Sequence, residues 1–123
     1  MAPMAATLAD DAAIDNVNAY IRTLPDNPAP VTIKGNANNG KNLYVTTCGT
    51  CHGPCGQGLH ATHAPRLAGM SDWYLATQMK NFKQGIRGAH AKDMYGPQMA
   101  SMAAIVGDDQ AINDLIAYVG TLR

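Results

Sequence analysis

Apolar residues recur three and four positions apart in three stretches of the chain, which is the spacing of one face of an α-helix. In the first stretch they are Ile14, Val17, Ile21 and Leu24. In the second they are Tyr74, Leu75, Met79 and Phe82, and in the third they are Ile112, Leu115, Ile116 and Val119. No stretch alternates between apolar and polar residues as a half-buried strand does. The pattern therefore predicts an all-α chain.

Local signals mark where these helices begin and end. Residues that can cap a helix N-terminus precede each stretch, namely Asp10 or Asp11, Ser71 or Asp72, and Asp108. Pro25 ends the first helix, and Gly85 is a natural stop for the second. Residues 86–97 are mixed in polarity and are predicted to be irregular, with a turn at their end.

A further short helix is predicted from Asn36 or Asn38 to Thr46 or Thr47. It contains Gly40, which costs a helix about 1 kcal/mol relative to alanine. A reason to keep glycine there is the close approach of another helix, and we expect this partner to be the last helix, near Tyr118. The intact domain then has three main helices.

The first 24 residues repeat the end of the chain. Aligned without gaps, residues 1–24 and 99–122 are identical at 13 of the 24 positions, including the paired methionines and the paired aspartates. Two generic amphipathic helices explain the periodicity but not the methionines. We therefore interpret residues 1–24 as the C-terminal fragment of a preceding copy of the same domain. Its apolar face has no evident place in a complete domain, so we expect self-association through residues 1–24.

Residues 25–32 have the composition of an extended linker, because two prolines disfavour helix there. The intact domain is predicted to occupy residues 33–123. Phenylalanine and tryptophan occur once each, so the apolar core is thin for a free-standing domain. A bound apolar group would supply the missing apolar mass.

Charge excludes one class of partner. Nine basic and nine acidic residues cancel over the chain, so no nucleic acid partner is expected. Residues 1–31 contain one Arg and four Asp, net −3, which leaves eight basic and five acidic residues, net +3, in the rest. A possible docking patch there consists of Lys80, Lys83, Arg87 and Lys92, although such a charge run is usually a solvated face.

The strongest chemical signal is the stretch Cys48-Gly49-Thr50-Cys51-His52. Two thiols at this spacing can each add to one vinyl group of a haem, and the following His can ligate the iron. The sequence thus predicts one haem c, bound covalently through Cys48 and Cys51. The third cysteine, Cys55, is expected to be a free thiol.

Two other sites use paired cysteines. A structural zinc ion needs four ligands, and this chain would have to recruit Cys55 and either His60 or His63. A redox dithiol normally lies between a strand and a helix, whereas several glycines here make residues 53–69 a loop. Haem is the interpretation that we favour.

An electron carrier normally has a second iron ligand opposite the proximal His52. The candidates are Met70, Met79, Met94, Met99 and Met102, with His60, His63 and His90 behind them. Met79 fits an apolar core stripe, while Met99 follows a turn that can cross the haem face. Met99 and Met102 both have equivalents in the repeat, so the repeat does not choose between them.

With these motifs, the chain resembles a class I cytochrome c domain, particularly those of two-domain, two-haem bacterial cytochromes. The matching residues are Gly40, Tyr44, residues 48–53 and 65–69, Tyr74, Leu75, Gln78, Met79, Gly85, Met99, Met102, Asp109, Leu115 and Tyr118. The resemblance implies the class I cytochrome c fold around one haem, preceded here by an extra helix. It also implies that the first methionine of the pair, Met99, ligates the iron.

Other residues receive roles from the resemblance combined with physical chemistry. The Pro65 carbonyl is expected to accept a hydrogen bond from Nδ1 of His52. Tyr74 and Trp73 have polar edges that could reach a haem propionate, and Arg66 and Arg87 could neutralise propionates, although both arginines could equally be solvated surface. Cys55 departs from the family pattern.

A looser resemblance, over residues 81–99, is to cytochrome c domains fused to subunit II of haem-copper oxidases. It implies that the parent protein is membrane-tethered and delivers electrons to a terminal oxidase. We expect one-electron transfer without bond-making catalysis, in the periplasm or at the periplasmic face of the inner membrane, because haem attachment of this type happens outside the bacterial cytoplasm. The alternative function is a haem enzyme or gas sensor with an open sixth position.

Overall fold

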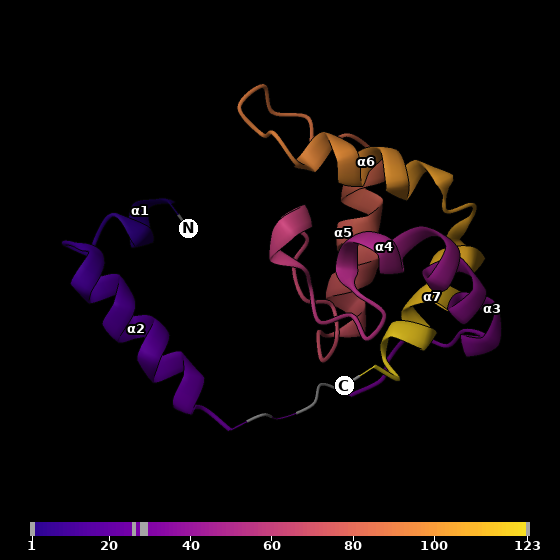
Figure 1. Cartoon of the computed structure of the whole chain (residues 1–123), viewed down its shortest axis with the longest axis horizontal. Helices are drawn as coiled ribbons and strands as arrows, with labels where there is room; N and C mark the ends of the chain where they lie inside the picture. The colour runs from indigo at the N-terminus through magenta and orange to yellow at the C-terminus, as the bar shows by residue number, and fades with distance from the viewer. Residues whose placement is uncertain (1, 26, 28–29, 123) are drawn as a thin grey trace.

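The computed structural model of the chain describes residues 2–25, 27 and 30–122 (Figure 1). Met1 of the repeat, Arg123 of the predicted domain, and residues 26 and 28–29 of the predicted linker lie outside the described part. The described residues form helices and contain no β-strand, which confirms the all-α prediction.

The helices agree with the apolar pattern and with two of the three predicted caps, whereas Ser71, at the N-cap of α5, makes no side-chain cap hydrogen bond. The three stretches of the apolar pattern form α2 (Asp11–Thr23), α5 (Asp72–Lys83) and α7 (Asp109–Val119). A short helix that the pattern does not predict, α1 (Ala2–Ala5), precedes α2. The carboxylates of Asp10 and Asp108 accept from the amides of Ala13 and Ala111 at 2.8 and 2.9 Å, so both copies of the repeat begin their helix in the same way.

The first helix of the domain extends further than predicted. Asn36 caps α3 (Ala37–Leu43), which continues through a π-helical turn, η1 (Tyr44–Cys48), into α4 (Gly49–His52). The prediction that it ends at Thr46 or Thr47 is wrong, because residues 37–52 contain no proline and no residue with positive φ, and the helix ends only at Gly53, whose φ is 82°. The haem motif is therefore part of a helix.

The sequence analysis does not predict α6 (Gly96–Ile105), the helix that carries Met99 and Met102. Pro97 lies in its first turn, where a missing amide proton costs nothing. Its apolar residues surround the helix instead of forming one stripe, so periodicity gives no signal.

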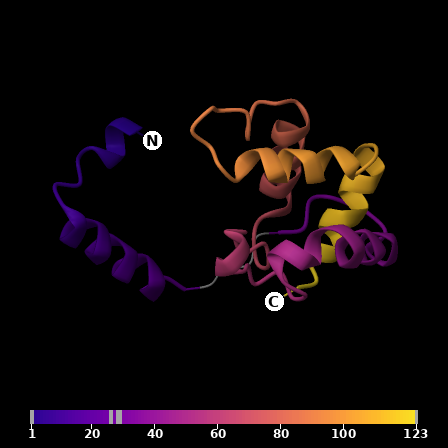
Figure 2. The same ribbon diagram turned by 45° about the horizontal axis from the view of Figure 1, so that its top comes forward.

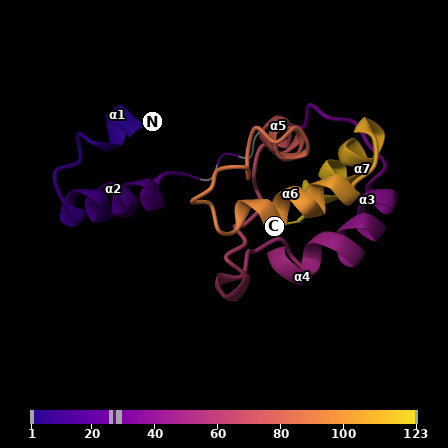
Figure 3. The same cartoon turned by 90° about the horizontal axis from the view of Figure 1, so that it is seen from above.

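The helices pack around α7, which contacts α3 and α5, while α5 also contacts α6 (Figures 2 and 3). The buried core comes from these helices and from η1, and consists of Tyr44, Leu75, Met79, Phe82, Ala103, Val106, Ile112, Leu115, Ile116 and Val119. A Cβ built on Gly40 would lie 2.9 Å from Cβ of Tyr118, which confirms the predicted close approach of α3 to the last helix.

The segment with α1 and α2 lies apart from this body in all three views (Figures 1–3). No residue of α2 is buried, and its apolar side chains Ile14, Val17 and Ile21 are 42, 41 and 54% exposed. Their counterparts in α7 are at most 4% exposed. Among the residues that the structure describes, this helix face therefore has no packing partner.

Candidate functional site

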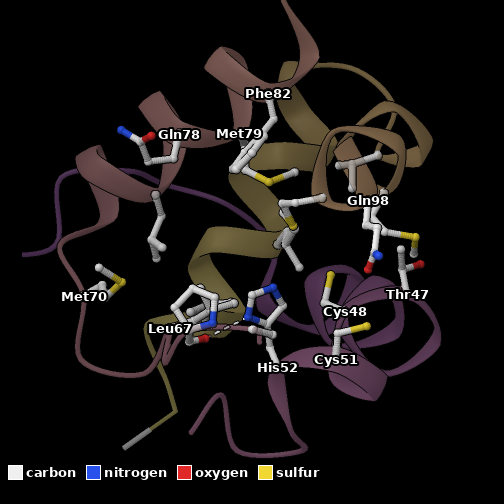
Figure 4. Close-up of a pocket in the computed structure, with 18 of the residues that line it drawn as sticks. Thr47, Cys48, Cys51, His52, Leu67, Met70, Gln78, Met79, Phe82 and Gln98 are labelled. Atoms are coloured by element: carbon white, nitrogen blue, oxygen red, sulfur yellow. Dashed lines mark hydrogen bonds between the residues drawn. The ribbon is translucent and has the colours of Figure 1, made fainter. Parts of the chain in front are cut away.

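A cavity of about 310 Å³ lies among α4, α5, α6, α7 and the loop after the Cys-Cys-His motif (Figure 4). Most of its wall is apolar, and Leu75, Met79, Phe82, Val106 and Leu115 contribute from the core. The cavity brings together every residue predicted for the cofactor: Cys48, Cys51, His52, Pro65, Tyr74 and Met99. Its size and lining suit a large, mostly apolar group.

His52 is held in one orientation at the wall of this cavity. It is 6% exposed, and its Nδ1 lies 2.8 Å from the carbonyl oxygen of Pro65 (Figure 4). A carbonyl can only accept, so Nδ1 carries the proton and Nε2 keeps its lone pair for a metal ion. This is the hydrogen bond that the sequence analysis expects.

Cys48 and Cys51 are free thiols that line the cavity. Burial, and to a lesser extent the neighbouring Cys51, raises the pKa of the Cys48 thiol to about 11. Such a thiol is protonated at neutral pH, which does not suit a redox dithiol. Over the described residues, no group of three Cys, His, Asp or Glu side chains has the geometry of a metal site, so zinc gains no support.

The loop after the motif is fixed to the motif by hydrogen bonds. The buried Tyr44 hydroxyl donates to the Gly53 carbonyl at 2.6 Å, and Thr62 Oγ1 donates to the Cys51 carbonyl at 2.7 Å. Burial is the main reason that the pKa of Tyr44 rises to about 12. These bonds position Pro65 behind His52.

The structure divides the candidates for a sixth ligand. Met70, Met79, Met99 and Met102 line the cavity, whereas Met94 is 77% exposed and lies outside the lining. Met79 is part of the buried core, as expected. Met99 and Met102 are three residues apart on α6, so both reach the cavity from the same helix face. Of the three candidate histidines, His63 lines the cavity and His60 and His90 do not.

Of the four residues suggested as partners of the haem propionates, two line the cavity and two do not. Tyr74 lines the cavity, whereas its neighbour Trp73 is 59% exposed and outside the lining. Arg66 is also outside it and donates to the Ala68 carbonyl. The Arg87 guanidinium lies 4.7 Å from the centre of the Phe82 ring, donates to Gln78 Oε1 at 2.9 Å, and lines the cavity.

Two members of the suggested docking patch make contacts within the chain. Lys80 Nζ lies 3.1 Å from Asp109 Oδ2, and Lys83 Nζ donates to the carbonyls of Val106 and Gly107 just after α6. Lys83 therefore stabilises the C-terminal end of α6. These contacts support a structural role for this part of the patch.

Sequence reasoning missed Tyr95 as a cavity residue. Its ring stacks on that of His63, with ring centres 4.1 Å apart and 24° between the planes. No local signal predicts this contact, because it joins residues far apart in the chain across two irregular segments.

The residues present fit a c-type haem. Two thiols, an imidazole with a free Nε2 and four methionine thioethers surround one apolar space, and thiols, imidazole and thioether are the donors that such a haem uses. In the part of the chain that the structure describes, no helix combines the length and apolar character required to cross a bilayer.

Comparison with known proteins agrees with this fit. The family model for cytochrome c matches residues 37–123. Cytochrome c-554(547) of Halothiobacillus neapolitanus is 35% identical over 92 residues, covering 72% of this chain and 99% of that protein. The thiosulfate dehydrogenase electron acceptor of Stutzerimonas stutzeri is 31% identical over 132 residues, and cytochrome c4 of Azotobacter vinelandii is 36% identical over 76 residues.

These two relatives are longer than the matched region. The alignments cover 98% of this chain and 58% of the electron acceptor, and 60% of this chain and 35% of the cytochrome c4.

The chain belongs to the cytochrome c family. Its domain therefore implies a covalently attached c-type haem and haem-based electron transfer.

Proposed function

We propose that the chain transfers single electrons through one haem c that is attached to Cys48 and Cys51 and ligated by His52 and Met99. The observation that carries this proposal is the fixed orientation of His52, whose Nδ1 is bound to the Pro65 carbonyl inside a cavity that Met99 also lines. Tyr74 has a place at the cavity wall from which it can bind the haem.

The chain's own residues set the behaviour of such a site. When bound, the haem supplies a metal ion that changes oxidation state by one electron. The Pro65 carbonyl holds the His52 proton and raises the donor strength of Nε2. A methionine thioether favours the ferrous state and raises the reduction potential. With His52 and Met99 both bound to the iron, no position would remain at which the iron could bind a substrate.

Met99 is proposed as the ligand because of the resemblance, with support from its position. Its amide is bound to the carbonyl of Tyr95 at 3.4 Å in the first turn of α6, and its side chain packs on the buried core. Met102 lines the same cavity one turn later, so it is the matched alternative.

The visible spectrum of the haem-loaded protein tests this proposal. Methionine ligation gives ferric haem a weak far-red band, which we expect to vanish in Met99→Ala and to persist in Met102→Ala. The reverse result would transfer the ligand role to Met102. A wild-type protein that lacks the band and whose reduced form binds carbon monoxide at once would support the haem enzyme or gas sensor instead.

We also propose that residues 1–24 belong to a preceding cytochrome c domain in the parent protein, joined by the linker 25–32 to the domain at 33–123. The repeat, the equivalent caps at Asp10 and Asp108, and the exposed face of α2 support this arrangement. The alignment with the longer electron acceptor also extends beyond the family match, over 98% of the chain.

The proposed partners are redox proteins of the periplasm or of the periplasmic face of the inner membrane, with the parent protein tethered there and passing electrons to a haem-copper oxidase. Two relatives are named thiosulfate dehydrogenase electron acceptors, which supports a dehydrogenase as the donor. Stopped-flow spectroscopy with a purified dehydrogenase and a purified oxidase measures both steps. The assignments would be contradicted if the dehydrogenase did not reduce the haem and the oxidase did not oxidise it.

A further inference from the structure

The rings of His63 and Tyr95 lie close and nearly parallel, at 4.1 Å and 24°, and both residues line the cavity. Stacked aromatic rings at this separation attract each other. Because the two residues come from different loops, the contact, which we call the 63–95 stack, joins two walls of the cavity.

The His63 side of the stack is firmly held. His63 follows the short 3₁₀ helix η2 (His60–Thr62), whose Thr62 is bound to the Cys51 carbonyl at 2.7 Å. The backbones of Leu59 and Ala64 bond to each other on either side of the turn. His63 itself adopts the left-handed conformation with φ 53°, which non-glycine residues rarely do. Its ring is thus placed by a turn that is bound to the haem motif.

The Tyr95 side is part of the beginning of α6. The Tyr95 carbonyl accepts from the amides of Gln98 and Met99 at 3.1 and 3.4 Å. Its own amide and that of Gly96 donate to Asp93 Oδ1. A shift of Tyr95 therefore moves the backbone that positions Met99.

The segment before Tyr95 is bound to α5 at its start, through Arg87, but none of its residues is buried. Residues 86–94 contain no helix or strand, and the side chains of Ile86 and Met94 are 69 and 77% exposed. Figure 1 shows this segment as a loop that projects from the domain between α5 and α6. The 63–95 stack therefore joins this loop to the turn that is bound to the haem motif.

We infer that the 63–95 stack holds the start of α6, and with it Met99, in position against the haem. His63 and Tyr95 are positioning residues, since they act through Met99 and not on the iron. This inference rests on the proposed ligation by His52 and Met99. Without the stack, Met99 would leave the iron more often, and a small external ligand would therefore bind to the ferrous iron faster.

The test measures the rate at which carbon monoxide binds to the reduced, haem-loaded protein. His63→Asn removes the ring and keeps a residue that tolerates the left-handed conformation. Tyr95→Ala removes the other ring, and Tyr95→Phe retains it. His60→Asn is the matched control, because His60 is exposed and outside the cavity lining, and its ring is tilted by 43° at 5.8 Å from that of His63 instead of being stacked on it.

We expect His63→Asn and Tyr95→Ala each to bind carbon monoxide about three- to tenfold faster than wild type, the range typical of one aromatic pair. The double variant should be no faster than the faster single variant, because either change already breaks the stack. Tyr95→Phe and His60→Asn should keep the wild-type rate. Haem content and the far-red band of each variant show that it is folded and ligated.

The inference would be overturned if both single variants bound carbon monoxide at the wild-type rate, or if their two effects multiplied in the double variant. If Tyr95→Ala does not fold, the comparison of His63→Asn with His60→Asn decides the question alone. A wild-type protein without the far-red band that binds carbon monoxide immediately would instead overturn the proposed ligation, so the two failures are distinguishable.

Discussion

Gly40 of α3 lies against the backbone of Asp114 in α7, so closely that a Cβ on Gly40 would come within 1.9 Å of the Asp114 carbonyl oxygen. Helix α3 leads directly into the haem motif, and α7 forms part of the cavity wall. This backbone contact therefore sets the distance between the haem motif and the opposite side of the site.

Gly40→Ala should destabilise the protein by about 1–3 kcal/mol, even though alanine favours a helix by about 1 kcal/mol over glycine. The added methyl group forces α3 and α7 apart. Denaturant unfolding of the holoprotein measures the change. Gly107→Ala is the control, since its Cβ would meet only Ala111 Cβ at 3.8 Å. Equal stability of the two variants would show that α3 can move without cost.

The carboxylate of Asp114 makes the stability of the protein depend on pH. The amide of Asn36 and the side chain of Gln110 donate to the Asp114 carboxylate, each at 2.7 Å, and these bonds lower the pKa of Asp114. A lowered folded-state pKa means that the unfolded chain takes up the proton first. The stabilisation is therefore present above the unfolded-state pKa of about 3.9 and is lost as pH falls further.

Asp114→Asn should lower the free energy of unfolding at neutral pH, and its difference from wild type should shrink as pH falls below about 4. Unfolding curves recorded across this pH range provide the measurement. A difference that is the same at every pH would mean that the charge of Asp114 contributes nothing.

Arg87 is expected to tune the haem electrostatically. In the described part of the chain it is the only lysine or arginine that lines the cavity, and the haem carries two carboxylates. Positive charge near the iron favours the ferrous state. Arg87→Gln should thus lower the reduction potential by tens of millivolts, in a titration of the holoprotein. Lys92→Gln, which removes the same charge outside the lining, should have a smaller effect, and an equal shift would contradict this role.

The exposed face of α2 predicts self-association of the chain. Ile14, Val17 and Ile21 expose apolar surface that the equivalent residues of α7 bury. A variant lacking residues 1–24, and the single change Ile14→Asp, should both reduce the mass measured by light scattering without altering the haem spectrum. An unchanged association state in both variants would refute the prediction.

Most of the helices could be predicted from the sequence, because local chemistry specifies them. The apolar spacing and the aspartate cap of α7 are encoded within a few residues, and Gly40 signals a close helix contact through its cost alone. The Cys48 to His52 motif and the repeat likewise require no tertiary information. They are sufficient to predict a haem domain and a second copy of its last helix.

The remaining features depend on contacts that no local signal encodes. Packing makes residues 96–105 a helix although they lack a single apolar stripe, and it brings both Met99 and Met102 to the cavity. Packing also engages Lys83 at the end of α6 and stacks His63 on Tyr95. The sequence by itself determined the haem chemistry and the main helices. Only the tertiary structure decided which side chains surround the cavity, because residues distant in the chain become neighbours when the helices pack.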